Sequence, residues 1–434
     1  MSDRNVLLAS VLAVAALPAA PTPVAAQDRD GDPLREALEA NRHIVTLQGG
    51  RLGGPGGELL LEAGRASQFF LIGEEHGVAE IPVLTAALFT ELAGSGYRHL
   101  AIETGDGLAE RLERAARDPE PLDALTRFYA DHWPGAPFYT LRTEAELLVA
   151  AVAAVGAAEQ GGVLWGLDYD IFGDRHALGR LRALAVTDAQ RQAVDAAIEV
   201  ADSALERALA EKDPAHVMMF GGPAAALDAL YEAFEPEPDS EADRIISLLR
   251  ETRAINAHWL EGEPWRSNER RAQWNKRQLG RLWYDAWERS GDPPRVMLKF
   301  GSNHMMRGRT PTGVFDLGTV AASLAEALGR PSFHLLVVGG PGTRRAVLNP
   351  TVMEYVPAPA ELAATRWAAP VVELTDPERW TLFDLRPLRA PASRGELGEM
   401  PPRVERTLFG FDAVLVLTGS TPNEALELPA SAGR

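Results

Sequence analysis

Two short stretches of the chain share one plan, and this plan constrains the fold more than any other feature. The stretch FFLIGEEHG at 69–77 opens with four consecutive apolar residues and then turns polar. Such a run leaves no face for water, so it predicts a central strand of a parallel sheet, which we expect Gly73 to end. VMLKFGSNH at 296–304 repeats the plan. The polar residues then follow the carboxyl ends of two strands, where open α/β sheets hold ligands; they are Glu74, Glu75, His76, Asn303 and His304.

Two further apolar runs end in acidic residues. His99–Ile102 is followed by Glu103, and the run at 162–168 ends in Asp168. Amphipathic helical patterns separate these runs, so we predict right-handed crossovers that bring the acids to the same edge as the histidines. Asp168 is expected to support the site from behind. The expected fold is α/β, with a mostly parallel central sheet, helices on both faces and pseudo-repeated halves.

The domain organisation follows from composition along the chain. Residues 1–26 carry Arg4, an apolar stretch and a small-residue boundary before Gln27, which is typical of a secretory signal peptide. We expect 27–434 to form a single α/β domain with a helical insertion at about 176–262. The proline-rich segment 350–402 predicts irregular structure with a short strand or two. The mature protein is expected in the periplasm or outside the cell, without stable membrane insertion.

Charge and cysteine content exclude several classes of function. The 434 residues carry a net charge of −18, which disfavours binding to nucleic acid and to anionic membranes. Small-molecule or cationic ligands are the expected partners. The chain has no cysteine, so thiol catalysis, thiolate metal sites and disulfides are excluded. It also lacks the G-x-S-x-G, H-E-x-x-H, phosphate-loop and dinucleotide motifs.

Histidines and carboxylates at strand ends fit two kinds of site. In the first, His76, His304 and an acid, Glu103 or Glu74, bind a divalent metal ion that acidifies a water. In the second, no metal takes part: a histidine removes a proton from water, Glu74 or Glu103 orients it, and the other histidine stabilises the oxyanion. Arg271, on a polar helix expected at 267–289, is a candidate anion clamp in either version. Aromatic residues of the loop expected at 128–139 are candidates to line a pocket: Trp133, Phe138 and Tyr139.

The paired motifs GEEH at 73–76 and GSNH at 301–304, together with LAIETG around Glu103 and GLD ending at Asp168, resemble one superfamily. It includes erythromycin esterases, ChaN-type haem-binding lipoproteins and TIKI/TraB-type proteins. The resemblance covers roughly 69–418. The spacing of GEEH is closer to that of the ChaN and TIKI proteins, because esterases usually place one more residue before the histidine. It implies that His76 is a base or ligand with Glu74 and Glu103 as partners, and that His304 is the second catalytic or ligand histidine.

The expected function is therefore a secreted or periplasmic hydrolase that directs water to an ester or amide, with the activation supplied by His and Glu or by a metal ion that they bind. The alternative is a ChaN-like protein that captures haem or a metal ion without turnover. A third hypothesis is a degenerate scaffold whose pocket recognises a partner. The cofactor, a divalent metal ion, haem or none, is left open by the sequence.

Overall fold

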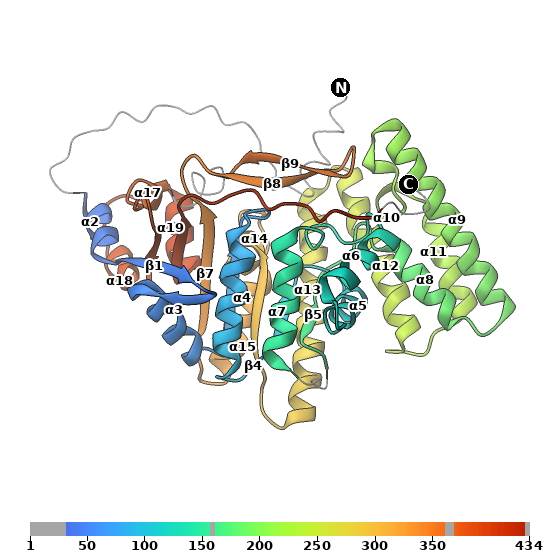
Figure 1. The fold of residues 1–434 in the computed structure, drawn as a ribbon, viewed down its shortest axis with the longest axis horizontal. Coiled ribbons are helices and arrows are strands. Elements are labelled where there is room, and N and C mark those ends of the chain that lie inside the picture. Colours follow the sequence, from blue (N-terminus) through green and yellow to red (C-terminus); the bar gives the residue numbers. More distant parts are fainter. Residues whose placement is uncertain (1–31, 157–160, 361–368, 430–434) are drawn as a thin grey trace.

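A computed structural model describes residues 32–156, 161–360 and 369–429. The signal peptide expected at 1–26 lies outside these residues. Their strands build a nine-stranded sheet in the order β2-β1-β10-β11-β7-β3-β6-β4-β5, beside a separate hairpin of β8 and β9 (Figure 1). The strands are β1 Arg42–Gln48, β2 Arg51–Gly53, β3 Phe69–Glu74, β4 Tyr97–Ile102, β5 Leu164–Gly166, β6 Arg295–Gly301, β7 Ser332–Gly339, β8 Arg344–Asn349, β9 Glu354–Pro359, β10 Trp380–Asp384 and β11 Ala413–Leu417.

The helices fill the connections between the strands. They are α2 Pro33–Ala40, α3 Gly54–Ala66, α4 Glu80–Ala93, α5 Asp106–Ala116, α6 Pro121–Asp131, α7 Arg142–Val155, α8 Asp174–Leu184, α9 Asp188–Glu211, α10 Met218–Gly221, α11 Ala224–Phe234, α12 Glu241–Leu260, α13 Pro264–Ser290, α14 Ser302–Met305, α15 Leu317–Ala327, α17 Ala369–Val372, α18 Arg389–Ser393 and α19 Pro402–Gly410, with 3₁₀ turns at Pro214–His216 and Arg386–Leu388. No helix in the described ranges has the length and apolar character needed to cross a bilayer.

The mostly parallel α/β architecture predicted from the sequence is confirmed. Six neighbouring strands, from β11 through β7, β3, β6 and β4 to β5, run parallel, and β10, β1 and β2 add an antiparallel edge. Alternate residues of β3 face opposite cores: Phe70 and Ile72 pack with α3, α4, α5 and α7, whereas Phe69 and Leu71 pack with α13, α15 and α19. Burial on both faces explains the unbroken apolar run of this strand.

The order of the strands explains why the two polar tetrads meet. β3 and β6 are direct parallel neighbours, and Glu74 pairs in register with Gly301. β4 lies on the other side of β6, so Glu103 follows the next strand of the same edge. The end of β6, which is distant in sequence, thus lies between the ends of β3 and β4.

Gly73 does not end β3, contrary to the expectation, because the strand continues through Glu74. The glycine instead permits close packing. A Cβ atom at Gly73 would lie 3.1 Å from the Cα of Ser302 and 3.0 Å from the ring of Phe411. Any larger residue would push α14 away from the strand.

Some elements of the structure differ from the sequence-based expectation or were missed by it. The glycine-rich segment at 49–57, whose composition alone suggests a turn, has two roles: Gly49 and Gly50 turn the β1–β2 hairpin, and Gly54 begins α3. The strands β1 and β2 were not predicted, because their partly exposed, polar-interrupted sequence gives no clear period. Helix α6 also takes up residues to Asp131 of the stretch interpreted as an aromatic loop.

Between α8 and α12 the helices pack on each other around their own apolar cluster, whose members include Leu178, Val194 and Leu249. Figure 1 shows α8, α9 and α11 standing together at one end of the molecule. This matches a helical segment near 176–262, while its status as an insertion in a single domain stays a prediction. In 350–402, the described residues include β9, β10 and short helices, in line with the expected strand or two.

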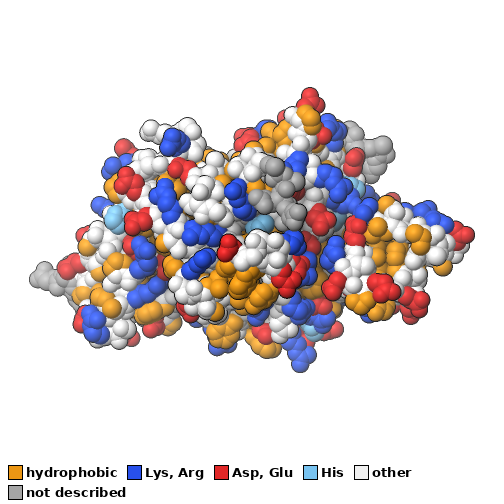
Figure 2. Space-filling model, turned by 90° about the horizontal axis from the view of Figure 1, so that it is seen from below, with side chains coloured by type: hydrophobic (Ala, Val, Ile, Leu, Met, Phe, Trp, Pro, Cys, Tyr) orange, Lys and Arg blue, Asp and Glu red, His pale blue; other side chains and the backbone are white. Residues whose placement is uncertain are grey.

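The β8–β9 hairpin lies across the end of the sheet where the tetrads are (Figure 1). Its docking requires Gly77, which has φ of +85° and whose Cβ would meet the Ala346 carbonyl oxygen at 1.9 Å. The amide of Ala346 donates to the Gly77 carbonyl at 2.8 Å. On the molecular face seen in Figure 2, acidic and basic side chains are interspersed.

Candidate active site

His76 is held in one orientation by the carboxylate of Glu74. Its Nδ1 lies 2.8 Å from Glu74 Oε1, and its ring stacks on Phe138 with 4.4 Å between the ring centroids. A hydrogen bond from Nδ1 to the carboxylate fixes the tautomer in which Nε2 has its lone pair free. Nε2 points to Glu103, 3.4 Å from Oε2.

His304 repeats this arrangement with a different carboxylate. Its Nδ1 lies 2.8 Å from Asp316 Oδ2, and its Nε2 lies 3.6 Å from Glu103 Oε1. Asp316 is the N-cap of α15, so its backbone position is set by the helix that follows. The two histidines therefore approach Glu103 through different oxygens, each oriented from behind by its own acid.

Glu103 is a buried anion at the centre of this group. Besides the two histidines, its carboxylate accepts from the Gly301 amide at 2.7 Å and from Arg271 Nη2 at 2.7 Å. Burial alone would raise the pKa of Glu103, but the histidines and Arg271 outweigh it and lower the pKa to about 2. Glu103 is thus ionised at any physiological pH.

The same carboxylate acts on both histidines. Burial would lower the pKa of His76, but Glu103 and Glu74 outweigh burial and raise it above the usual 6.5. The pKa of His304 is raised as well, because Asp316 and Glu103 outweigh both burial and the positive charge of Arg271. Both imidazoles therefore keep their proton to a higher pH than a free histidine does, which suits proton transfer near neutrality.

Arg271 and Asp168 meet at the site as a pair. Arg271 Nε donates to Asp168 Oδ1 at 2.9 Å, and its Nη2 binds both Asp168 Oδ2 and Glu103. These hydrogen bonds hold the guanidinium between the two carboxylates. Arg271 also lies over the ring of Tyr169 at 4.6 Å. Both residues proposed from the sequence as supporting groups thus lie next to Glu103.

Behind Glu74 lies a buried ion network that sequence reasoning missed. Lys299 Nζ donates to Glu74 Oε1 at 2.8 Å and to Glu144 Oε1 at 2.7 Å, and the Lys299 side chain is 2% exposed. Burial raises the pKa of Glu144 to about 7, although Lys299 opposes the shift. The lysine holds Glu74 ionised against the cost of burial, and so helps Glu74 to orient His76.

Two of the polar residues that follow the strand ends, Glu75 and Asn303, lie in different surroundings from His76 and Glu103. Glu75 points away from His76: its Oε2 accepts from the Gly339 amide at 3.2 Å, and its Oε1 lies 3.3 Å from Arg345 of β8. Glu75 therefore ties the hairpin to the sheet. The side-chain oxygen of Asn303 is buried and makes no hydrogen bond with the described residues.

The hairpin also positions the aromatic ring beside His76. Tyr355 of β9 accepts a hydrogen bond from the Phe138 amide at 2.6 Å. Phe138 has φ of +72°, a conformation that costs a non-glycine residue about 1–3 kcal/mol and that surrounding contacts must impose. Of the other two aromatic candidates, Tyr139 is buried close to Glu144 and Glu103, and Trp133 packs in a separate apolar cluster.

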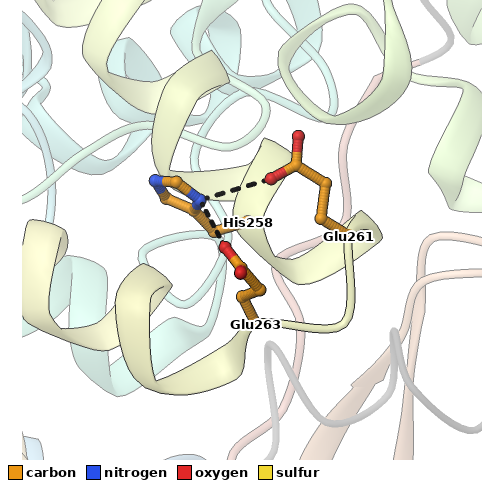
Figure 3. A group of neighbouring side chains, drawn as sticks. All are labelled: His258, Glu261 and Glu263. Carbon is orange, nitrogen blue, oxygen red and sulfur yellow. Dashed lines mark ion pairs between the residues drawn. The ribbon is translucent and has the colours of Figure 1, made fainter.

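The metal set predicted from the sequence, His76, His304 and Glu103, stays a prediction, and a second group of possible ligands lies elsewhere. Within the described ranges, the group of three whose ligand atoms all lie within 4.8 Å of one another is His258, Glu261 and Glu263, on the turn from α12 to α13. Figure 3 shows His258 Nδ1 facing the two carboxylates, at 3.4 and 3.5 Å. Glu263 also pairs with Arg266 at 2.9 Å. At the sheet edge, Glu103 contacts His76 and His304 through separate oxygens.

Sequence signals existed for some of the missed residues. Lys299 is a lone charge inside an otherwise apolar strand, directly before the second tetrad, and such a residue needs a buried partner. The sequence around Asp316 indicates the start of a helix but not a contact with His304. Glu144 comes from α7, and nothing in its local sequence marks it.

Comparisons with known proteins agree with this fold at low sequence identity. No family model matches the chain, and a search of curated proteins gave no match. Among solved structures, a Bacillus cereus structural-genomics protein aligns with a TM-score of 0.57 and 12% identity, over 91% of this chain and 98% of that one. A mutant of the erythromycin esterase EreC in its open conformation aligns with a TM-score of 0.55 and 15% identity, over 86% and 95%. A succinoglycan biosynthesis protein aligns with a TM-score of 0.55 and 12% identity, over 91% and 98%. At these identities the likeness concerns the fold, which this chain has in common with an esterase.

Proposed function

We propose that the protein is a hydrolase that directs water to an ester, by acid and base groups of its own side chains. The observation that carries this proposal is the pair of carboxylate-bound histidines on the two sides of Glu103. General acid–base catalysis needs imidazoles of fixed tautomer within reach of one reacting centre. The fold likeness to an erythromycin esterase supports the reaction class.

In this mechanism His76 Nε2 removes a proton from water while Nδ1 remains bonded to Glu74. The hydroxide attacks the ester carbonyl carbon, and the developing oxyanion is stabilised by protonated His304 and by Arg271. Glu103 stabilises the imidazolium that forms on His76. Collapse of the tetrahedral intermediate breaks the bond to the alkoxide, which takes its proton from the His76 imidazolium. The products are a carboxylic acid and an alcohol.

The wild-type protein should hydrolyse activated esters such as p-nitrophenyl acetate faster than buffer does. Glu103→Gln keeps the shape of the side chain and deletes its charge, so we expect kcat to fall on the order of tenfold or more while KM changes little. Glu58→Gln, at an exposed position of α3, is the control for loss of one negative charge. Absence of turnover by the wild type, with uptake of haem and a Soret band that disappears in His76→Ala, would favour the binding protein instead.

The acid limb of the pH profile should report His76. The base is active when neutral, so kcat/KM should fall as pH drops through the pKa of His76, which Glu103 and Glu74 raise above 6.5. Glu74→Gln removes one of these carboxylates, so the pKa of His76 should fall and the acid limb should move to lower pH. An unchanged limb in this variant would assign the titration to another group.

We also propose that the protein acts in the periplasm or outside the cell. This rests on the apolar stretch before residue 27 and on its small-residue boundary. Mass spectrometry of protein from its native host should find a chain that starts at or near Gln27. Recovery of the protein with an intact Met1 from the cytoplasm would contradict the proposal.

A further inference from the structure

A cavity of about 220 Å³ lies between α5, α8, α12 and α13. Two of its wall residues adjoin the candidate active site. Asp106 begins α5, directly after the turn that follows Glu103, and Trp274 donates from its indole to the Asp168 carbonyl at 3.3 Å. Because α5 begins just beyond the carboxyl end of β4, this part of the wall lies at the edge of the sheet where Glu103 lies.

The carboxylates of the wall are largely committed to partners. Arg281 binds Asp106 at 2.7 Å, and Arg180 binds Glu241 through two parallel hydrogen bonds, the longer of 2.6 Å. Bidentate pairing of this kind leaves little of either charge for a ligand.

The remaining acidic side chains of the wall are exposed or accept a hydrogen bond near the start of α12. Asp243 accepts from the Asp239 amide at 3.1 Å, at the start of α12. Asp239 and Glu110 are exposed, and Glu110 stands one helical turn before Arg114, which is exposed as well.

One cation of the wall has no such partner. No hydrogen bond or ion pair joins Arg111 to any residue in the described ranges, although Arg111 is half-buried. Burial and the nearby guanidinium groups of Arg180 and Arg114 lower its pKa, in spite of Glu241 and Glu110. Burial and repulsion between like charges raise the electrostatic free energy of this guanidinium, and a bound anion would lower it.

His176 adds to the same wall a buried side chain whose Nε2 makes no hydrogen bond with the described residues. It is 3% exposed. The nearest carboxylate oxygen, Asp170 Oδ2, lies 3.5 Å away and is likewise unbonded. The other oxygen of Asp170 accepts from Thr104 Oγ1 at 2.8 Å and from the Gly105 amide at 2.7 Å, so this pair also braces the turn that follows Glu103.

We infer that this cavity binds the anionic group, a carboxylate or a phosphate, of a small organic molecule through Arg111. The further step rests on the proposed function: the hydrolase then acts on esters that carry such a group. The overall charge of −18 repels anions at long range. Binding therefore has to come from the local guanidinium groups.

Calorimetric titration of the wild-type protein with phenyl phosphate and, separately, with benzoate tests the cavity. At least one should bind saturably with one site per chain, and Arg111→Gln should weaken it on the order of tenfold or more. Arg127→Gln on α6 is the matched control and should bind as the wild type does. The tighter of the two probes identifies phosphate or carboxylate as the preferred group. Absence of saturable binding, or equal affinity in Arg111→Gln, would overturn the inference.

Ester kinetics test anion binding by the cavity and ester hydrolysis independently of each other. Among p-nitrophenyl esters, the monosuccinate or monoglutarate should have a lower KM than the acetate. Arg111→Gln should remove this advantage, whereas the control Arg127→Gln should keep both the advantage and the wild-type kcat for the acetate. Turnover of the acetate without any advantage for the anionic esters would refute the substrate class alone. Arg111-dependent binding of the probes without turnover of any ester would leave the cavity in place and refute the hydrolase.

Discussion

His76→Ala should lower kcat/KM for an activated ester on the order of a thousandfold. The substitution removes the nitrogen that accepts the proton of water, and no other described side chain is held between Glu74 and Glu103 in its place. The loss should appear mainly in kcat, because the base acts in the transition state and contributes little to ground-state binding.

Two controls separate this effect from unfolding. His43→Ala, on β1, removes a histidine far along the sheet order from β3 and should leave kcat/KM unchanged. The circular dichroism spectrum of His76→Ala should match that of the wild type. A variant that keeps its fold and more than a tenth of the wild-type kcat/KM would show that His76 is not the base.

The central strands were predictable because their environment is uniform. β3 and β6 are covered by helices on both faces, so almost every position favours an apolar residue, and the run stands out in the sequence. The antiparallel edge has no such uniformity. β1 is partly exposed along most of its length, and its pairing with β10, more than 330 residues away, is a tertiary contact that no local pattern encodes.

The residues of the candidate site also differ in how well the sequence predicts them. His76, Glu103 and His304 follow directly from strand ends, where the change from apolar to polar residues is visible in the sequence. Their neighbours Asp316 and Glu144 come from helices, and their roles depend on where those helices dock. Local sequence patterns therefore predict the side chains next to the reacting atoms more readily than the side chains that orient them.

The interior ion network leads to the largest expected change in stability. Lys299→Met should destabilise the fold by about 3–5 kcal/mol, because it removes the cation and leaves Glu74 and Glu144 buried close together. Lys276→Met is the matched control: this lysine is partly exposed and donates to the Phe315 carbonyl, so its loss should change stability by at most about 1 kcal/mol.

Adding Glu144→Gln to Lys299→Met should restore part of the loss, since one of the two uncompensated carboxylates is then neutral. Thermal unfolding of the four proteins measures these differences as shifts in Tm. A Lys299→Met protein as stable as Lys276→Met would mean that Glu74 and Glu144 share a proton readily without the lysine, and that the ion pairs contribute little to the fold. In that case Lys299 would still act on His76 through Glu74, and its removal should appear as a shift in the pH profile of kcat/KM without a change in Tm.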